Sequence, residues 1–241
     1  MNIALIGYGK MGKAIEIVAQ SRGHEIALII TKSNLTDLER INLKNVDVAI
    51  DFSIPSAAKK NIMNAINLGI PIISGTTGWQ NQISDVEAYC KKKKGSFLYA
   101  SNFSLGVNLF YELNKKMAEI MRKHDDYAID IREIHHKEKI DIPSGTAISL
   151  AEQIIAKNKY INQWNSNQNF MKNSVNIDSI RKDNVVGTHQ INYKSEIDNI
   201  SIEHKAYSRN GFALGAIISA EWIINKNGCF SMTDVLFSEK H

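Results

Sequence analysis

The sequence is poor in cysteine and has no long apolar run, and both absences narrow the classes of protein to which it can belong. Cys90 and Cys229 are the only cysteines, and they stand in unrelated contexts. They form neither a disulfide framework nor a Cys-x-x-Cys metal pair, so we expect two idle thiols in a reducing compartment. No stretch approaches the roughly 18 apolar residues of a membrane span, and no signal peptide is recognisable. A cytoplasmic protein that binds no membrane is therefore expected.

The net charge of the chain is also small. The 29 Lys and Arg residues exceed the 25 Asp and Glu residues by a formal net charge of +4, spread along the chain. This excess suits a small anionic ligand at least as well as nucleic acid, and we expect no nucleic-acid partner. Hydrophobic residues make up 44% of the 241 residues, which excludes a disordered or collagen-like chain and suggests one or two globular domains.

The first hundred residues alternate short apolar runs with stretches of helical periodicity. The apolar runs that predict strands are residues 3–6, 26–30, 46–52, 70–73 and 97–100. Apolar side chains at helical spacing over 11–19 and 57–66 predict helices between them. Strands without polar alternation, joined by helices, predict a parallel sheet that is covered on both faces.

The second half has a different rhythm. Residues 127–134 predict a strand, and 147–155 a helix. Two antiparallel strands are expected over 189–194 and 197–204, and a last long helix over 213–224. The polar stretch 158–176 has no clear period and is expected to be irregular.

The glycine pattern G-x-G-x-x-G occurs near the N-terminus as Gly7-Tyr8-Gly9-Lys10-Met11-Gly12. It follows a predicted strand and opens a predicted helix, which is the context that dinucleotide binding requires. The first glycine permits a tight turn, the second lets the backbone approach a pyrophosphate, and the third lets helix and strand pack closely. The positive end of the helix attracts the phosphates. A plain strand–helix turn is the alternative.

The end of the second strand bears on the choice of cofactor. A site that prefers NAD usually has Asp or Glu there for the ribose hydroxyls, whereas this strand continues as Thr31-Lys32-Ser33. Lys32 can meet a 2′-phosphate, unless it is an ordinary exposed lysine. We therefore expect NADPH, NADH or both as cofactor, without strict NAD specificity.

Residues 133–147 concentrate histidine, lysine and helix-capping residues in the sequence E-I-H-H-K-E-K-I-D-I-P-S-G-T-A. Ser144 can cap the helix that begins next, and Gly145 exposes its first amides, which makes a second anion site. Imidazoles and a lysine beside it can supply protons and neutralise an acidic substrate. A solvated charged loop before a capped helix is the alternative. No metal is expected, because adjacent histidines on a strand point to opposite faces and no further His or Cys lies close in sequence.

This segment resembles the signature of the dihydrodipicolinate reductase family, also called 4-hydroxy-tetrahydrodipicolinate reductase, which is E-[LI]-H-H-x-x-K-x-D-x-P-S-G-T-A. Every fixed position matches. Further similar stretches are 51–55 (D-F-S-I-P), 75–78 (G-T-T-G), 100–108 (A-S-N-F-S-L-G-V-N), Arg181 with 186–189 (V-G-T-H), and 204–209 (H-K-A-Y-S-R). The resemblance extends over nearly the whole chain.

The resemblance implies roles for individual residues. His135 is the expected acid–base residue, and Lys139 is an expected proton donor. The residues expected to bind the substrate are His136, Ser144, Gly145 and Thr146. Those expected to bind the cofactor are Gly7, Tyr8, Gly9, Lys10, Met11, Gly12, Lys32, Gly75, Thr76, Thr77, Ala100, Ser101, Asn102 and Phe103.

The resemblance also implies how the chain is organised. An α/β domain with a Rossmann-type, doubly wound parallel sheet, at 1–104 and 212–241, binds the dinucleotide. A second, α+β domain with a mixed sheet, at 105–211, binds the substrate and assembles the homotetramer. Thr31 departs from the family, because many members carry an acidic residue there, and 158–176 has few residues that align.

The expected activity is the NAD(P)H-dependent reduction of 4-hydroxy-tetrahydrodipicolinate to tetrahydrodipicolinate, a small dicarboxylate, in lysine and diaminopimelate biosynthesis. One alternative is another Rossmann oxidoreductase, such as an aspartate or aldehyde dehydrogenase. A semialdehyde dehydrogenase needs a nucleophilic cysteine, and neither cysteine stands in a suitable loop. The other alternative is a non-catalytic NADPH sensor or scaffold, which has no need of residues 133–147.

Overall fold

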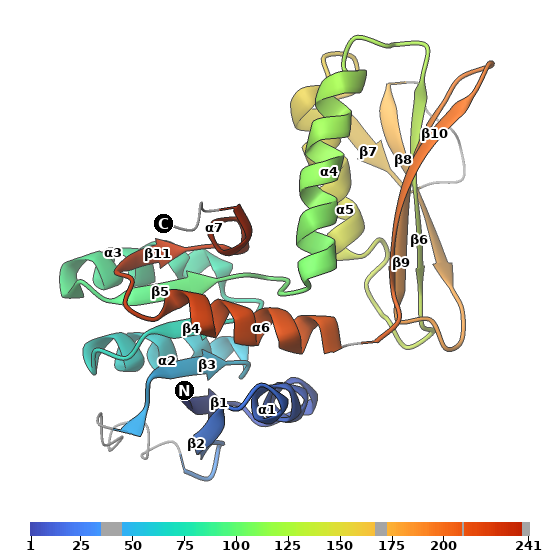
Figure 1. Ribbon diagram of the computed structural model, residues 1–241. Coiled ribbons are helices and arrows are strands. Elements are labelled where there is room, and N and C mark those ends of the chain that lie inside the picture. Colours follow the sequence, from blue (N-terminus) through green and yellow to red (C-terminus); the bar gives the residue numbers. More distant parts are fainter. Residues whose placement is uncertain (35–44, 167–172, 209, 238–241) are drawn as a thin grey trace. The chain divides into compact units, whose positions relative to one another are not determined.

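The computed structural model describes residues 1–34, 45–166, 173–208 and 210–237, and the chain divides into two compact units (Figure 1). Unit 1 consists of Met1–Leu105 with Asn210–His241, and unit 2 is Gly106–Arg209. No helix among the described residues is long and apolar enough to cross a membrane.

Unit 1 is built on a six-stranded sheet in the order β11-β5-β4-β3-β1-β2, and every neighbouring pair is parallel. Its strands are β1 (Asn2–Ile6), β2 (Glu25–Ile30), β3 (Val48–Asp51), β4 (Ile72–Ser74), β5 (Ser96–Tyr99) and β11 (Gly228–Phe230). The strand order reverses between β1 and β3, which is the place where such sheets bind dinucleotides at the carboxyl ends of their strands.

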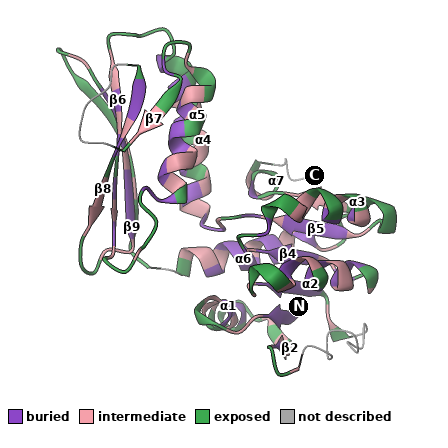
Figure 2. Ribbon diagram, turned by 180° about the vertical axis from the view of Figure 1, so that it is seen from behind, coloured by how far each residue is buried: buried purple, intermediate pink, exposed green. Residues whose placement is uncertain are grey.

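Helices cover both faces of this sheet, as the unbroken apolar strands predict. Leu5 of β1 packs in one apolar cluster with α1 and α6, and the next residue, Ile6, packs in another with α2 and α3. Consequently most strand residues are buried (Figure 2). The helices of this unit are α1 (Lys10–Ser21), α2 (Pro55–Asn67), the short 3-10 helix η3 (Gln80–Gln82), α3 (Ile83–Lys93), α6 (Asn210–Ile223) and α7 (Met232–Phe237).

Unit 2 carries a five-stranded mixed sheet in the order β10-β9-β6-β8-β7. Its strands are β6 (Ala128–His135), β7 (Gln163–Asn165), β8 (Ser174–Arg181), β9 (Gly187–Lys194) and β10 (Asn199–Ala206). The β10–β9 and β9–β6 pairs are antiparallel, whereas β6–β8 and β8–β7 are parallel. Two helices, α4 (Leu105–Met121) and α5 (Gly145–Lys157), contribute side chains to one apolar core with the sheet, including Phe110, Leu150 and Ile131. This mixed α+β architecture confirms the predicted fold class.

The structure differs from the sequence-based expectation in several places, and β11 and α7 are among the elements that were not predicted. A long helix, α4, was not predicted, and β7 and the start of β8 lie inside the stretch expected to be irregular. The cysteines are not in unrelated surroundings: β11 pairs with β5, so the Cys229 thiol comes to lie beside the Cys90 thiol of α3. Both remain free, and burial raises the pKa of Cys90 to about 12.

Candidate active site

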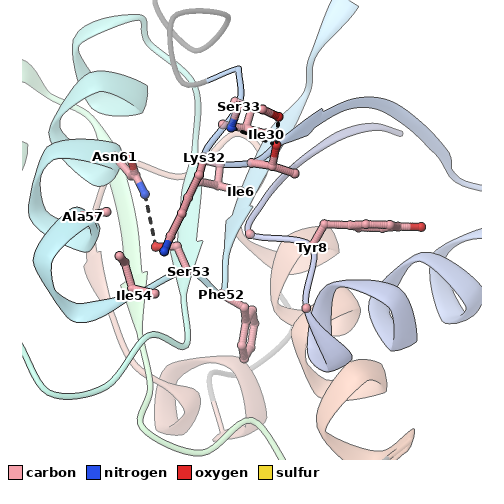
Figure 3. Close-up of a pocket in the computed structure, with 13 residues that line it drawn as sticks. Ile6, Tyr8, Ile30, Lys32, Ser33, Phe52, Ser53, Ile54, Ala57 and Asn61 are labelled. Carbon is pink, nitrogen blue, oxygen red and sulfur yellow. Dashed lines mark hydrogen bonds between the residues drawn. The ribbon is translucent and has the colours of Figure 1, made fainter.

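A cavity of about 540 Å³ in unit 1 lies where the strand order reverses (Figure 3). It is lined by Ile6, Gly7, Tyr8, Gly9, Ile30, Thr31, Lys32, Ser33, Phe52, Ser53, Ile54, Ala57 and Asn61. Four predicted cofactor residues therefore meet here: Gly7, Tyr8, Gly9 and Lys32. The contribution of the β3–α2 loop was missed, although the D-F-S-I-P stretch at its start signalled it.

The three glycines of the loop have the separate roles that the pattern predicts. Gly7 has a φ of +91°, and a Cβ atom there would lie 2.2 Å from the carbonyl oxygen of Phe52. A Cβ at Gly12 would lie 2.4 Å from the carbonyl oxygen of Gly7, so α1 packs directly on the turn. A Cβ at Gly9 would meet nothing within 4 Å, which leaves the backbone open to a ligand at that position.

The end of β2 carries a short, hydrogen-bonded loop. The Thr31 N–H donates to Asn34 Oδ1 at 2.7 Å, and Asn34 Nδ2 donates to the Ile29 carbonyl at 2.9 Å. Lys32 is exposed and extends its side chain into the cavity (Figure 3). No acidic side chain occurs among the described residues that line the cavity. The cavity wall therefore suits an anionic ligand at the β2 end.

A buried carboxylate links the two loops that follow β3 and β4. Asp51 Oδ1 accepts from Ser53 Oγ at 2.7 Å and from Asn61 Nδ2 at 3.2 Å, and its Oδ2 accepts from Ser74 Oγ at 2.8 Å and Thr76 Oγ1 at 2.7 Å. Burial raises the pKa of Asp51, against the effect of these hydrogen bonds. The hydroxyl of Thr76 is thus engaged within the protein.

The remaining predicted cofactor residues do not line this cavity. Gly75 packs against the Phe52 ring, which a Cβ would meet at 2.3 Å, while Thr77 is exposed. Within 100–103, Ser101 is exposed and Phe103 is buried, with its ring centroid 5.6 Å from that of Phe52. The other residues outside the lining are Lys10, Met11, Gly12, Thr76, Ala100 and Asn102.

In unit 2, the end of β6 brings Glu133 and His135 beside His189 of β9. Glu133 and His135 are two residues apart and so share one face of the sheet, and His189 is the register partner of Glu133. His135 Nδ1 lies 3.2 Å from Glu133 Oε2, and the His135 and His189 ring centroids are 5.0 Å apart. His136 pairs instead with Glu138, its Nδ1 2.9 Å from the carboxylate.

The first turn of α5 is built as the sequence predicts. Ser144 is the N-cap, and its Oγ accepts from the Ala147 N–H at 3.2 Å. The Ser144 N–H donates to Glu133 Oε1 at 3.0 Å, and its Oγ lies 3.2 Å from His189 Nε2. Ser144 is therefore enclosed by the protein, whereas the helix end at Gly145 is exposed.

The loop between β6 and α5 holds its two lysines differently. Lys139 Nζ donates to both Asp141 carboxylate oxygens, at 2.7 and 2.8 Å, and 24% of its side chain is exposed. Arg181 of β8 donates to the backbone carbonyls of Lys139 and Asp141, at 3.3 and 2.6 Å. Lys137 instead forms an ion pair with Asp183 at the surface. Of the two, only Lys139 has its backbone anchored to the sheet, through Arg181 of β8.

Glu133 dominates the electrostatics of this cluster. Burial alone would raise the pKa of Glu133, but its interactions with the neighbouring His135 and His189 are among those that lower it below its usual range. Burial lowers the pKa of His189, and the Glu133 carboxylate offsets this only in part. Possible ligand atoms of these three residues lie within 4.8 Å of one another, close enough for a metal ion. Local sequence does not predict this grouping, because His189 is distant along the chain from Glu133 and His135.

Two further positions that the sequence singled out are Thr146 and Arg209. Thr146 is half-buried, and its hydroxyl interacts with Tyr111 of α4. Arg209, which ends the H-x-A-x-S-R stretch, lies outside the described residues.

Comparisons with known proteins agree with this arrangement. The family descriptions "Dihydrodipicolinate reductase, N-terminus" and "Dihydrodipicolinate reductase, C-terminus" match residues 1–103 and 106–236. A 4-hydroxy-tetrahydrodipicolinate reductase from Christiangramia forsetii is 48% identical over 98% of both chains. One from Rickettsia bellii is 38% identical over 97% of this chain and 94% of its own.

Solved structures resemble the fold as well. A dipicolinate-bound dihydrodipicolinate reductase from Paenisporosarcina sp. TG-14 aligns over 98% of this chain and 99% of its own, with a TM-score of 0.76 and 21% identity. A probable dehydrogenase from Thermotoga maritima covers 98% of this chain and 92% of its own, at a TM-score of 0.60 and 10% identity. The resemblance inferred from residues 133–147 is confirmed: the chain belongs to the dihydrodipicolinate reductase family, NAD(P)H-dependent oxidoreductases that reduce 4-hydroxy-tetrahydrodipicolinate in lysine and diaminopimelate biosynthesis.

Proposed function

We propose that the end of β6 and the first turn of α5 form the substrate site, with His135 as the acid–base residue and Lys139 as a proton donor. The observation that carries this proposal is the loop anchored by Arg181, which fixes Lys139 between a buried histidine cluster and an exposed helix N-terminus. A solvated charged loop, the alternative interpretation of this segment, would not need its backbone to be held by Arg181.

The same site suits a small cyclic dicarboxylate. The positive end of α5 at Gly145 and Thr146 binds one carboxylate, and His136 and Lys139 neutralise the charge. Lys139 now pairs with Asp141, so a substrate carboxylate would exchange with that partner. Ser144 acts by capping the helix, because its own polar groups are engaged. The Paenisporosarcina relative binds dipicolinate, a ligand of the same chemistry.

The residues of unit 2 carry out the proton transfer of the reaction. When NAD(P)H is bound, its nicotinamide supplies the hydride that reduces the imine formed by loss of water from the 4-hydroxy precursor. Lys139 and His135 supply the proton that the substrate ring must gain as negative charge develops on it. Holding His135 at the end of β6 and Lys139 in the loop that follows removes the entropic cost of bringing them together in the transition state.

The cavity of unit 1 binds the adenosine and pyrophosphate parts of the cofactor. The open backbone at Gly9 and the helix end at Lys10 and Met11 accept the pyrophosphate, and Lys32 meets a 2′-phosphate, which favours NADPH. The Asp51 network holds the loops after β3 and β4, and the second of these carries residues 75–77. Because Thr76 and Phe103 have buried side chains, these residues contact the cofactor through their backbone.

The domain expected at residues 1–104 and 212–241, to which unit 1 closely corresponds, therefore serves the cofactor. Residues 105–211 serve the substrate and the assembly of a homotetramer in the cytoplasm. The test of the whole proposal is the oxidation of NADPH and of NADH by the purified protein, with and without the product of a coupled synthase. Steady turnover that depends on the synthase product is expected, with NADPH favoured. Tight cofactor binding without turnover would instead indicate a sensor or scaffold.

A further inference from the structure

Glu133 is fully buried beside His135, and the proposed chemistry gives it no task. A buried carboxylate is costly unless hydrogen bonds and positive charge compensate it. Here the compensation is divided between the two oxygens. Oε1 accepts from the Ser144 N–H at 3.0 Å and from Ser179 Oγ at 2.8 Å, and Arg181 Nη2 lies 3.5 Å away.

The other oxygen faces the histidines. Glu133 Oε2 lies 3.2 Å from His135 Nδ1 and 3.7 Å from His189 Nε2. Neither Glu133 Oε2 nor His135 Nδ1 has a hydrogen-bond partner among the described residues. Each of these two buried atoms is therefore the nearest available partner of the other. With hydrogen on Nδ1 the ring turns a donor toward this oxygen, whereas the other tautomer would set two acceptors 3.2 Å apart.

The remaining sides of the His135 ring are also fixed. A Cβ atom at Gly187 would lie 3.2 Å from His135 Nε2, so a side chain at that position would crowd the second ring nitrogen. The His189 ring packs edge-on against His135, at an interplanar angle of 69°. In the structure His135 Nδ1 faces Glu133 and Nε2 faces Gly187.

Arg181 extends the same network to the lysine. It is the register partner of His135 on β8, and its guanidinium bridges the Glu133 carboxylate and the backbone carbonyls of Lys139 and Asp141. One buried ion pair thus touches the ring of His135 on one side and the backbone that carries Lys139 on the other.

We propose that Glu133 is the positioning residue of this reductase: it holds the Nδ1–H of His135, so that Nε2 exchanges the proton, and through Arg181 it fixes the backbone of Lys139. This inference rests on the proposed role of His135. The charged and titratable groups that face the cluster are Arg181 from β8, His189 from β9 with His204 of β10 beyond it, and Lys139 from the loop. Glu133 carries the negative charge of this cluster, and its Oε2 faces His135 Nδ1.

The decisive comparison uses Glu133→Gln and Glu133→Asp, with Asp178→Asn as the control, because Asp178 is an exposed acidic residue on the same sheet. Glu133→Gln should lower kcat at least about tenfold with the KM for NADPH unchanged. The alkaline limb of its kcat–pH profile should move to lower pH, because the amide no longer favours the protonated ring. Glu133→Asp, which keeps the charge, should retain the wild-type limb with a reduced kcat, and the control should match wild type.

A purely structural role would lower kcat and the melting temperature together and leave the limb in place, which would overturn the proposal. A metal held by Glu133, His135 and His189 would show as loss of wild-type activity in EDTA, and that result would also overturn it. We expect EDTA to have no effect, because Arg181 already supplies positive charge at the carboxylate.

A measurement on the wild-type protein covers the case in which Glu133→Gln fails to fold. The ¹⁵N chemical shifts of the His135 imidazole should report hydrogen on Nδ1 in the neutral ring. A neutral ring with hydrogen on Nε2 would contradict the inference while leaving the role of His135 intact. Conversely, an unchanged kcat in His135→Ala would refute the proposed function and not the geometry of the pair.

Discussion

At the scale of single residues, similar side chains in the sequence have different surroundings in the structure. Lys137 and Lys139 stand two positions apart in a charged segment, and composition gives no reason to prefer either. The family pattern separates them, and the contacts agree: Lys137 pairs at the surface, whereas Lys139 lies in a loop bound by Arg181. The contact between Glu133 and His189 could not be predicted from local sequence, because the two residues lie on separate strands.

Lys32 is the residue on which we expect the choice of cofactor to depend. It extends into the cavity of unit 1, whose described lining has no acidic side chain to bind ribose hydroxyls. Lys32→Ala should raise the KM for NADPH by the equivalent of about 1–2 kcal/mol, which is typical of a charge-assisted hydrogen bond, and leave the KM for NADH nearly unchanged. Steady-state kinetics with both cofactors measures this. Equal effects on the two would refute the role.

His189 should make unit 2 sensitive to acid. Burial holds its pKa below the ordinary value of 6.5, so the unfolded chain binds a proton more readily than the folded one. The free energy of opening should therefore fall as the pH drops below about 6.5, and it should be regained as the pH rises again. Hydrogen exchange of the β6 and β9 amides across this range measures the effect. His189→Gln should lose less protection than wild type, and a parallel loss in both proteins would exclude His189 as the cause.

At the scale of elements, the helices and strands with an uninterrupted apolar pattern could be predicted from the sequence, and those without one could not. The parallel strands and the helices α1, α2, α5 and α6 were recognised because their apolar spacing is regular. The buried stripe of α4 contains Asn114, whose Nδ2 donates to the Leu150 carbonyl at 3.0 Å, and this polar residue obscured the helix. The strands β7 (Q-W-N) and β11 (G-C-F) have three residues each, and neither continues the kind of apolar run that revealed the equally short β4.

The glycine loop gives a paired prediction about one element. A Cβ at Gly12 would lie 2.4 Å from the Gly7 carbonyl oxygen, so Gly12→Ala must push α1 away from β1. It should lower the free energy of unfolding by about 1–3 kcal/mol, the usual cost of overpacking. Gly9→Ala should leave stability nearly unchanged, because its Cβ meets no atom within 4 Å, yet weaken cofactor binding.

Urea unfolding and fluorescence titration with NADPH separate these two effects. If Gly9→Ala and Gly12→Ala lost stability equally, the three glycines would not have the separate roles assigned to them.

At the scale of the whole molecule, exposed apolar side chains in unit 2 bear on assembly. Ile197, in the turn after β9, is 91% exposed, and Ile200 on the edge strand β10 is 42% exposed. Edge strands and apolar patches of this kind are usually covered in a native assembly. Family resemblance and these side chains together predict a homotetramer formed through unit 2.

Light scattering should therefore give about 108 kDa, four chains of 27.1 kDa, at micromolar concentration. Ile197→Asp combined with Ile200→Lys should shift the protein toward smaller species. Ile17→Lys, at an exposed apolar position in unit 1, is the matched control and should keep the tetramer. A stable and active wild-type monomer would exclude this assembly.

The central claim, that the 133–147 segment carries the chemistry, is tested most directly by steady-state kinetics of His135→Ala, Lys139→Ala, their double variant and Lys137→Ala, with cofactor binding measured separately. The account predicts that each of the first two lowers kcat by about 10²–10⁴, and that the double variant loses much less than their product. Lys137→Ala should stay within about threefold of wild type, and cofactor binding should be intact throughout. If Lys137→Ala matches Lys139→Ala, or if neither His135→Ala nor Lys139→Ala lowers kcat more than about tenfold, the assigned site is contradicted.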